Sequence, residues 1–193
     1  MEIPELIDGP LRLRPWRDDD VDAVVVAQQD PVARLWSGTG GVRSREDAVA
    51  LLELLRTDAR RASWAVVDGS TGELLGSVSV HSIDLAQGDA QVGYWTAPPA
   101  RGRGVAPAAV DAACRWVFST LDAERIELCH AVENTASARV AEKAGFTQEG
   151  RLRRSFRYGD GVKHDELLWA RLADDPLPSS VDPASLPKAA RGR

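Results

Sequence analysis

Residues 92–106 read VGYWTAPPARGRGVA, and this stretch decides the fold. It leads from a strand-like segment through two prolines into a glycine- and arginine-rich loop, and an apolar helix is predicted from about Pro107 to Phe118. A helix start leaves backbone N–H groups without partners and carries positive potential, so it suits an anion such as phosphate. The loop lacks the Gly-Lys-Ser/Thr of a P-loop and the three spaced glycines of a dinucleotide fingerprint. Taken alone, it fits a solvated loop equally well.

Periodicity outside this stretch predicts alternating strands and helices. The expected elements are, in chain order, a strand at 11–16, a helix at 21–28 ended by Pro31, a helix beginning at Ser44, strands at 63–67, 74–83 and 90–96, the helix at 107–118, a strand at 125–132, a helix at 135–144 closed by Gly145, and strands at 146–153 and 165–172. One strand–helix–strand crossover lies in the second half, where parallel pairing is expected. The prediction is a mixed α/β (α+β) single domain over residues 1–173. Residues 174–193 contain four prolines and no periodicity, which predicts a tail without its own core.

Composition narrows the class of protein. The chain has 193 residues, 44% of them hydrophobic and 27% charged, which is ordinary for one soluble globular domain. No apolar run approaches the ~20 residues that span a bilayer, and the N-terminus does not resemble a signal peptide, so we expect a cytoplasmic protein that binds no membrane. The net charge of −5 without a broad basic face argues against nucleic acid. Cys114 and Cys129 are expected to be reduced, buried thiols, and no metal site is expected.

Several motifs stand in a fixed order around the loop. Arg101-x-x-Gly104-x-Ala106 follows Val92-Gly93-Tyr94-Trp95, Asn134-x-x-Ser137 comes next, and a run from Ala141 to Phe146 ends in Gly-Phe. With Leu11–Trp16 as a first strand, this order resembles the GNAT superfamily of N-acetyltransferases, closest to its RimJ/RimL-like branch. The resemblance spans about residues 8–172. It implies a GNAT-like domain with a central, mostly antiparallel mixed sheet, a β-α-β crossover and helices on both faces.

The resemblance also implies a binding site for acetyl-CoA as co-substrate. Backbone amides of the loop would hold the pyrophosphate, and the strands at 90–96 and 125–132 would separate at a bulge to admit pantetheine. Strands that separate leave unpaired ladder groups, which the amides of a ligand can satisfy. The implied cofactor-binding residues are Trp95, Arg101, Gly102, Arg103, Gly104, Val105, Ala106 and Asn134.

The implied catalytic residues are Ser137, Asn134 and Tyr94. Many members of the family carry a tyrosine that protonates the leaving thiolate, and this sequence has Ala141 in its place. The hydroxyl of Ser137 is then the expected proton donor, as in RimJ/RimL-like enzymes, while backbone near Tyr94 polarises the thioester carbonyl. The position of Ser137 at the start of a helix suits a helix cap equally well, and one hydroxyl does not easily both cap a helix and donate to a thiolate.

An ammonium must lose a proton before it can attack a thioester, so a base is needed. The sequence offers Glu133, Tyr94, His81 and Glu149 and does not decide among them. A cysteine nucleophile is not expected, because both thiols lie in apolar segments without an activating partner. We therefore expect direct attack by the amine in a ternary complex.

The acceptor is expected to be a primary amine, either a protein N-terminal α-amino group or a small molecule. Residues 30–45, with Trp36, and residues 154–164 are expected to line its side of the site, but they carry no motif that identifies it. The arginines at 151, 153, 154 and 157 fit a solvated hairpin face. A non-catalytic acyl-CoA-binding module stays open as an alternative because of Ala141, and a homodimer is left open as well.

Overall fold

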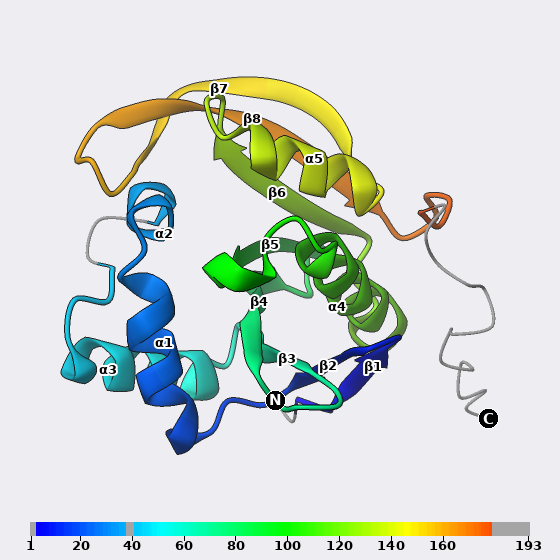
Figure 1. The fold of residues 1–193 in the computed structure, drawn as a ribbon. Helices are drawn as coiled ribbons and strands as arrows, with labels where there is room; N and C mark the ends of the chain where they lie inside the picture. Colours follow the sequence, from blue (N-terminus) through cyan, green and yellow to red (C-terminus); the bar gives the residue numbers. More distant parts are fainter. Residues whose placement is uncertain (1–2, 38–40, 179–193) are drawn as a thin grey trace, which may run out of the picture.

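One eight-stranded sheet crosses the molecule, in a computed structural model that describes residues 3–37 and 41–178 (Figure 1). Its strand order is β1-β2-β3-β4-β5-β6-β8-β7. The strands are β1 (Leu6–Asp8), β2 (Leu11–Arg14), β3 (Ala62–Asp68), β4 (Leu74–Asp84), β5 (Asp89–Thr96), β6 (Arg125–Ala131), β7 (Thr147–Arg157) and β8 (Lys163–Leu172). The helices are α1 (Val21–Gln28), α2 (Pro31–Trp36), α3 (Arg45–Thr57), α4 (Val105–Leu121) and α5 (Thr135–Lys143), with 3-10 turns at Asp18–Asp20 and Pro98–Ala100.

The sheet is antiparallel except between β5 and β6. These two strands are parallel because α4 carries the chain from the end of β5 back to the start of β6. The predicted mixed, mostly antiparallel sheet with one β-α-β crossover is confirmed.

Helices cover both faces of the sheet, as predicted, and the alternation of β3 shows why. Trp64 and Val66 pack into a core with α4, whereas Ala65 and Val67 pack into a second core with α1 and α3. Because successive side chains of a strand point to opposite faces, the two cores lie on opposite sides of the sheet. Figure 1 shows the helices in these two groups, with α1, α2 and α3 apart from α4 and α5.

β5 and β6 part soon after they meet. Their parallel register pairs Asp89 with Arg125, Ala90 with Ile126 and Gln91 with Glu127, yet β5 continues to Thr96 and β6 to Ala131. Beyond Gln91 the facing edges therefore leave backbone groups without a ladder partner. The separation agrees with the sequence-based expectation. An irregularity of register lies at the same level of β5, in its pairing with β4 between His81 and Asp84.

The chain departs from the predicted elements at several points. Pro31 does not simply end a helix; it is the first residue of α2, and Asp30 caps that helix by accepting from the N–H of Ala33 at 2.9 Å. β1 was not predicted, and α4 begins two residues earlier than Pro107. The predicted capping box of α3, formed by Ser44 and Asp47, is present. Most of the predicted tail, residues 179–193, and residues 38–40 of the glycine loop lie outside the described residues.

Candidate active site

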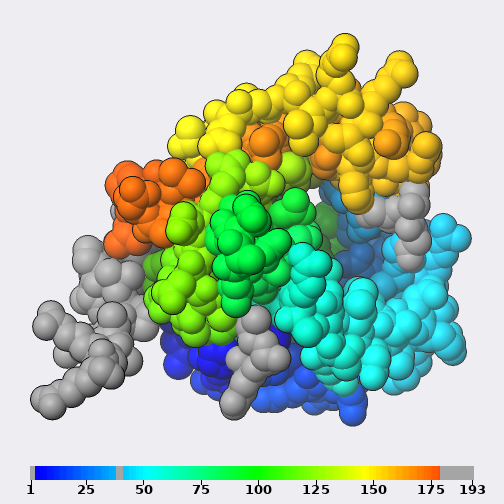
Figure 2. All heavy atoms as spheres, turned by 180° about the vertical axis from the view of Figure 1, so that it is seen from behind, coloured from blue at the N-terminus to red at the C-terminus, as the bar shows by residue number. Residues whose placement is uncertain are grey.

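A cavity of about 850 Å³ passes through the gap between β5 and β6. Its walls come from both faces of the sheet: α4 and α5 line one end, and α2, β7 and β8 line the other. In the space-filling view a hollow lies between the yellow β7 segment and the green atoms around residue 100 (Figure 2). Two molecules could therefore meet in this cavity from opposite sides of the sheet.

The end at α4 is built to hold an anion. Gly104 takes the left-handed conformation, with φ of 79°, and α4 starts at the next residue without a side-chain cap. The first N–H groups of the helix are consequently free to bind a ligand. A Cβ atom at Gly102 or Gly104 would meet nothing within 4 Å, so the loop surface is open. The side chain of Arg101 is held by Asp30, the capping residue of α2.

Two basic residues of α5 add positive charge at this end. Arg139 and Lys143 stand one helical turn apart and both line the cavity, opposite the loop. Sequence reasoning did not select them. Their i, i+4 spacing was visible, but only the packing of α5 beside α4 shows which face of the helix meets the cavity.

The residues predicted to bind the cofactor converge here, with one exception. The cavity is lined by Trp95, Arg101, Gly102, Gly104, Val105, Ala106 and Asn134. The side chain of Arg103 is exposed and does not line the cavity, but the prediction concerns its backbone N–H group, so the role of Arg103 stays a prediction. The described residues thus fit a pyrophosphate at the start of α4 and an extended ligand along the gap.

A hydrogen-bonded pair of hydroxyl groups lies midway along the cavity. Tyr94 of β5 and Ser137 of α5 are 43 residues apart in sequence, and their oxygens are 2.5 Å apart. Burial raises the pKa of Tyr94 to about 12, so its hydroxyl stays protonated at neutral pH. If Tyr94 donates to Ser137, the proton of Ser137 is free for a third group.

The alternative use of Ser137 as a helix cap is not what the structure shows. Asn134 is the cap of α5, and its side-chain oxygen accepts from the N–H of Ser137 at 3.2 Å. Asn134 therefore caps the start of the helix, and the hydroxyl of Ser137 is left to pair with Tyr94.

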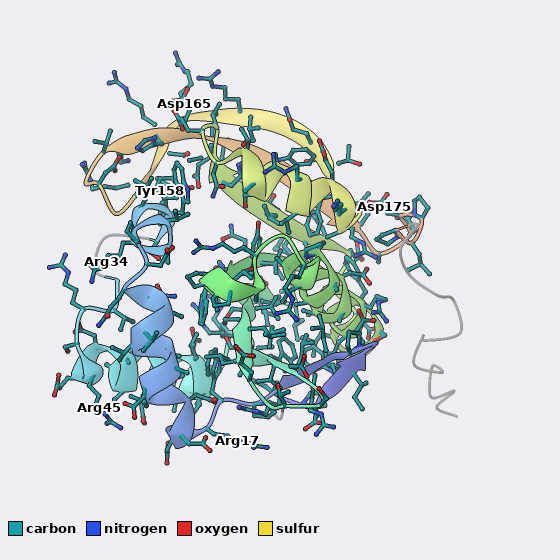
Figure 3. The ribbon with its side chains drawn as sticks, viewed as in Figure 1. Arg17, Arg34, Arg45, Tyr158, Asp165 and Asp175 are labelled. Carbon is teal, nitrogen blue, oxygen red and sulfur yellow. The ribbon has the colours of Figure 1, made fainter. Side chains whose placement is uncertain are left out.

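The other end of the cavity is aromatic and acidic. Trp36 of α2 packs edge-on against Tyr158 with ring centroids 5.7 Å apart, and Phe156 lies 5.0 Å from Tyr158. Figure 3 shows Tyr158 beside α2, beneath the β7–β8 hairpin. Glu166 of β8 is buried here, and the Tyr158 hydroxyl donates to it at 2.8 Å. Both regions that the sequence assigned to the acceptor side, 30–45 and 154–164, thus reach the cavity.

Two of the four predicted base candidates line the cavity in the structure, and the other two do not. Tyr94 and His81 line the cavity, and burial lowers the pKa of His81. Glu133 is exposed and pairs with His164 at 3.2 Å. Glu149 is bound to Arg125 at 2.6 Å, away from the cavity lining, and this hydrogen bond lowers its pKa. Only His81 and Tyr94 of this set are placed to meet an acceptor.

His81 also connects the main cavity to a second one of about 550 Å³. This second cavity lies between α3 and the strands β4 and β5, and shares Ser37, His81, Gly93, Tyr94 and Trp95 with the first. Gly93 lies beside His81 at this junction, where a Cβ atom would make an ordinary van der Waals contact, 3.6 Å from Nε2 of His81.

The two cysteines are unpaired, and the prediction of burial is right for only one of them. Cys114 is buried in α4, but Cys129 is exposed because its side of β6 faces the cavity rather than a core. His130, its neighbour, points to the other face, where Trp169 donates to its Nε2 at 3.0 Å. Burial raises the pKa of Cys114 to about 12. The pKa of Cys129 is raised to about 11, because its thiol is partly desolvated in the cavity wall and lies near the carboxylates of Glu166 and Glu127.

Comparison with known proteins identifies the family. A family model described as an acetyltransferase (GNAT) domain matches residues 10–147. The chain belongs to the GNAT family of acetyltransferases. This confirms the resemblance from which the loop, the β5–α4 junction and the Asn-x-x-Ser motif were interpreted.

Relatives and a solved structure place this GNAT domain near ribosomal and polyamine acetyltransferases. YdaF of Bacillus subtilis is 35% identical over 101 residues, 52% of this chain and 55% of YdaF. The spermidine N(1)-acetyltransferase of Vibrio cholerae is 31% identical (55% and 63% covered), and the ribosomal-protein-serine acetyltransferase of Escherichia coli is 29% identical (53% and 56%). These matches span less than two thirds of each relative. The structure of Mycobacterium smegmatis RimJ with CoA-disulfide superposes with a TM-score of 0.77 at 28% identity, over 84% of this chain and 82% of RimJ.

Three further observations describe this GNAT domain. Ala141, where the resemblance would place the family's tyrosine, is fully buried in the core and offers no hydroxyl to the cavity. Within residues 3–37 and 41–178, no cluster of three or more His, Cys, Asp or Glu side chains could hold a metal ion. No helix of the described part is long and apolar enough to cross a membrane.

Proposed function

We propose that the protein is an N-acetyltransferase that moves the acetyl group of acetyl-CoA directly to a primary amine. One observation carries the proposal: the anion-binding loop at α4 and the Tyr94–Ser137 pair open into one cavity that continues through the sheet. Such a cavity lets a bound thioester and an amine approach each other from opposite faces. RimJ of M. smegmatis, similar in fold and sequence, binds coenzyme A as a disulfide.

Each part of the cavity has a task in this reaction. The free N–H groups at the start of α4, with Arg101, Arg139 and Lys143, would bind the phosphates. Unpaired backbone groups near Tyr94 and Trp95, together with Asn134, would hold the pantetheine amides. Coenzyme A supplies the acetyl group as a thioester.

Transfer forms a bond from nitrogen to the acetyl carbon and breaks the carbon–sulfur bond. The ammonium loses two protons in all, the sulfur gains one, and one is released to solvent. We propose that Ser137 accepts from Tyr94 in this hydroxyl pair and donates its own proton to the sulfur. We propose direct attack, because both cysteines have raised pKa values and are poor nucleophiles at neutral pH.

The proposed class of acceptor rests on the names of relatives. Relatives named for spermidine and for a ribosomal protein support either a small amine or a protein N-terminal α-amino group. We propose a cytoplasmic location for this chemistry, which agrees with two unpaired cysteines.

The test is release of free thiol from acetyl-CoA with a panel of polyamines, small amines and N-terminal peptides. Thiol release above the hydrolysis background, with a mass increase of one acetyl group on the amine, is expected. Tight coenzyme A binding without any such release would instead favour the non-catalytic acyl-CoA-binding module that the alanine at position 141 left open.

A further inference from the structure

Glu166 has a combination of properties that the steps above do not use. Its side chain is only 7% exposed, yet it lines the main cavity at the end opposite the phosphate loop. Tyr158 donates to one carboxylate oxygen at 2.8 Å and Ser155 to the other at 2.6 Å. Both donors are neutral hydroxyl groups. None of the ion pairs within the described residues includes Glu166.

A buried carboxylate without a cation partner is costly unless a positive charge reaches it. The nearest basic group in the aromatic cluster is His164, and its two ring nitrogens are held by Asp160 at 2.8 Å and Glu133 at 3.2 Å. Its charge is therefore matched elsewhere. The hydroxyl of Tyr158 supplies no charge of either sign: burial and the hydrogen bond to Glu166 raise its pKa, so it does not ionise to phenolate.

Aromatic rings share the cavity wall with this carboxylate. Trp36, Phe156 and Tyr158 all line the same cavity as Glu166. The faces of such rings attract a cation, most strongly for tryptophan, and their edges and faces also accept aliphatic carbon. A carboxylate within an aromatic wall is the arrangement that suits an ammonium group on an alkyl chain.

The wall is fixed in place by a close backbone contact. The N–H of Gly159, in the β7–β8 turn, donates to the carbonyl of Leu35 in α2 at 3.0 Å. A Cβ atom at Gly159 would collide with the carbonyl oxygen of Arg34, so only glycine allows the turn to rest on the helix. Trp36 and Tyr158 are thereby presented as a preformed pair.

We infer that Glu166, with Tyr158, Ser155 and the ring of Trp36, binds the ammonium of the acceptor, and that the preferred acceptor is a primary amine on an unbranched aliphatic segment. This inference rests on the proposed acetyl transfer and adds the residue that recognises the amine. Sequence reasoning missed Glu166, because Asp165-Glu166-Leu167-Leu168 reads as an ordinary strand with no sign of which carboxylate is buried.

The test is calorimetric titration with hexylamine hydrochloride and with 1-hexanol, in protein saturated with coenzyme A at neutral pH. Hexylamine is charged under these conditions and 1-hexanol has the same length without the charge. We expect wild type to bind hexylammonium at least about tenfold more tightly, as one charged hydrogen bond provides. Glu166→Gln, which keeps the shape and can keep both hydroxyl partners, should abolish the preference. Glu149→Gln is the matched control and should retain it.

Failure of folding is excluded by measuring coenzyme A affinity and melting temperature for each variant. Trp36→Leu provides a second variant at a partly exposed position, and should weaken hexylammonium binding about threefold or more while leaving 1-hexanol unchanged. Equal binding of the two probes by wild type, no binding of either, or a preference that persists in Glu166→Gln would overturn the inference. Absent coenzyme A binding would overturn the proposed function instead, so the two failures are distinguishable.

Discussion

Replacing Ser137 by alanine tests the assignment of the leaving-group donor most directly. The variant removes the hydroxyl that lies 2.5 Å from the hydroxyl of Tyr94, but it keeps the backbone N–H that Asn134 caps. The start of α5 should therefore remain intact. The change separates a chemical role of Ser137 from a structural one better than substitution of a capping residue would.

The expected loss of rate follows from one hydrogen bond to a developing thiolate. Such a charged hydrogen bond contributes about 1.5–3 kcal/mol, which corresponds to roughly a ten- to hundredfold lower kcat. The Michaelis constant for acetyl-CoA should change little, because the loop at α4 and the backbone of β5 are untouched. Stability should fall by about 1–3 kcal/mol, since the buried hydroxyl of Tyr94 loses its partner.

Thiol release with the best amine of the panel gives kcat, and thermal melting gives the stability change. Ser119→Ala is the matched control, because Ser119 is exposed on α4 and its hydroxyl bonds only to the carbonyl of Trp116. An unchanged kcat together with a lower melting temperature would refute the proton-donor role and leave Ser137 as a partner of Tyr94 only.

Three further changes test other parts of the site. Gly104→Glu should weaken coenzyme A binding by more than tenfold in calorimetric titration. Gly104→Ala has the same backbone strain at φ of 79° without the charge, and should bind coenzyme A at least threefold more tightly than the glutamate variant. If the glutamate variant binds within about threefold of wild type, the loop is not the phosphate site. A double Cys114→Ala, Cys129→Ala variant should keep its turnover within a few fold of wild type. Intact-protein mass spectrometry of wild type with acetyl-CoA is the complementary measurement, and an acetyl adduct that disappears when the amine is added would contradict direct attack. The hydrogen bond to Asp160 raises the pKa of His164. The stability that this pair adds to the fold is therefore fully present below about pH 6.5, the ordinary pKa of histidine, and is lost as the pH rises through the raised pKa. The melting-temperature difference between wild type and His164→Gln should shrink toward alkaline pH, and a growing difference would contradict this assignment.

The local parts of the site could be predicted from the sequence because local signals specify them. The β5–loop–α4 junction follows from Gly104 and the apolar helix after it, and the cap of α3 follows from Ser44 and Asp47. α2 was missed because a proline was taken as a helix end, although proline at the first helical position after an aspartate is a start signal.

The rest depends on contacts between distant segments. The pairing of Tyr94 with Ser137 requires α5 to pack on the face of β5 that carries Tyr94, and no local pattern specifies that packing. The exposure of Cys129 depends on where β6 leaves β5, since its side chain lines a cavity beyond that point. The burial of Glu166 depends on the β7–β8 hairpin, from which Ser155 and Tyr158 donate to its carboxylate. Apolar neighbours in the sequence predicted a core for Cys129 that the gap in the sheet removes.

The gap between β5 and β6 has a kinetic consequence. In the proposed reaction the sheet separates the two substrates, and the gap between β5 and β6 lets each reach the cavity from its own side. Neither has to pass the other on the way in, and neither product has to wait for the other on the way out. The geometry therefore imposes no order of addition, and initial-rate patterns of a random-order ternary complex are the ones to expect from a protein shaped in this way.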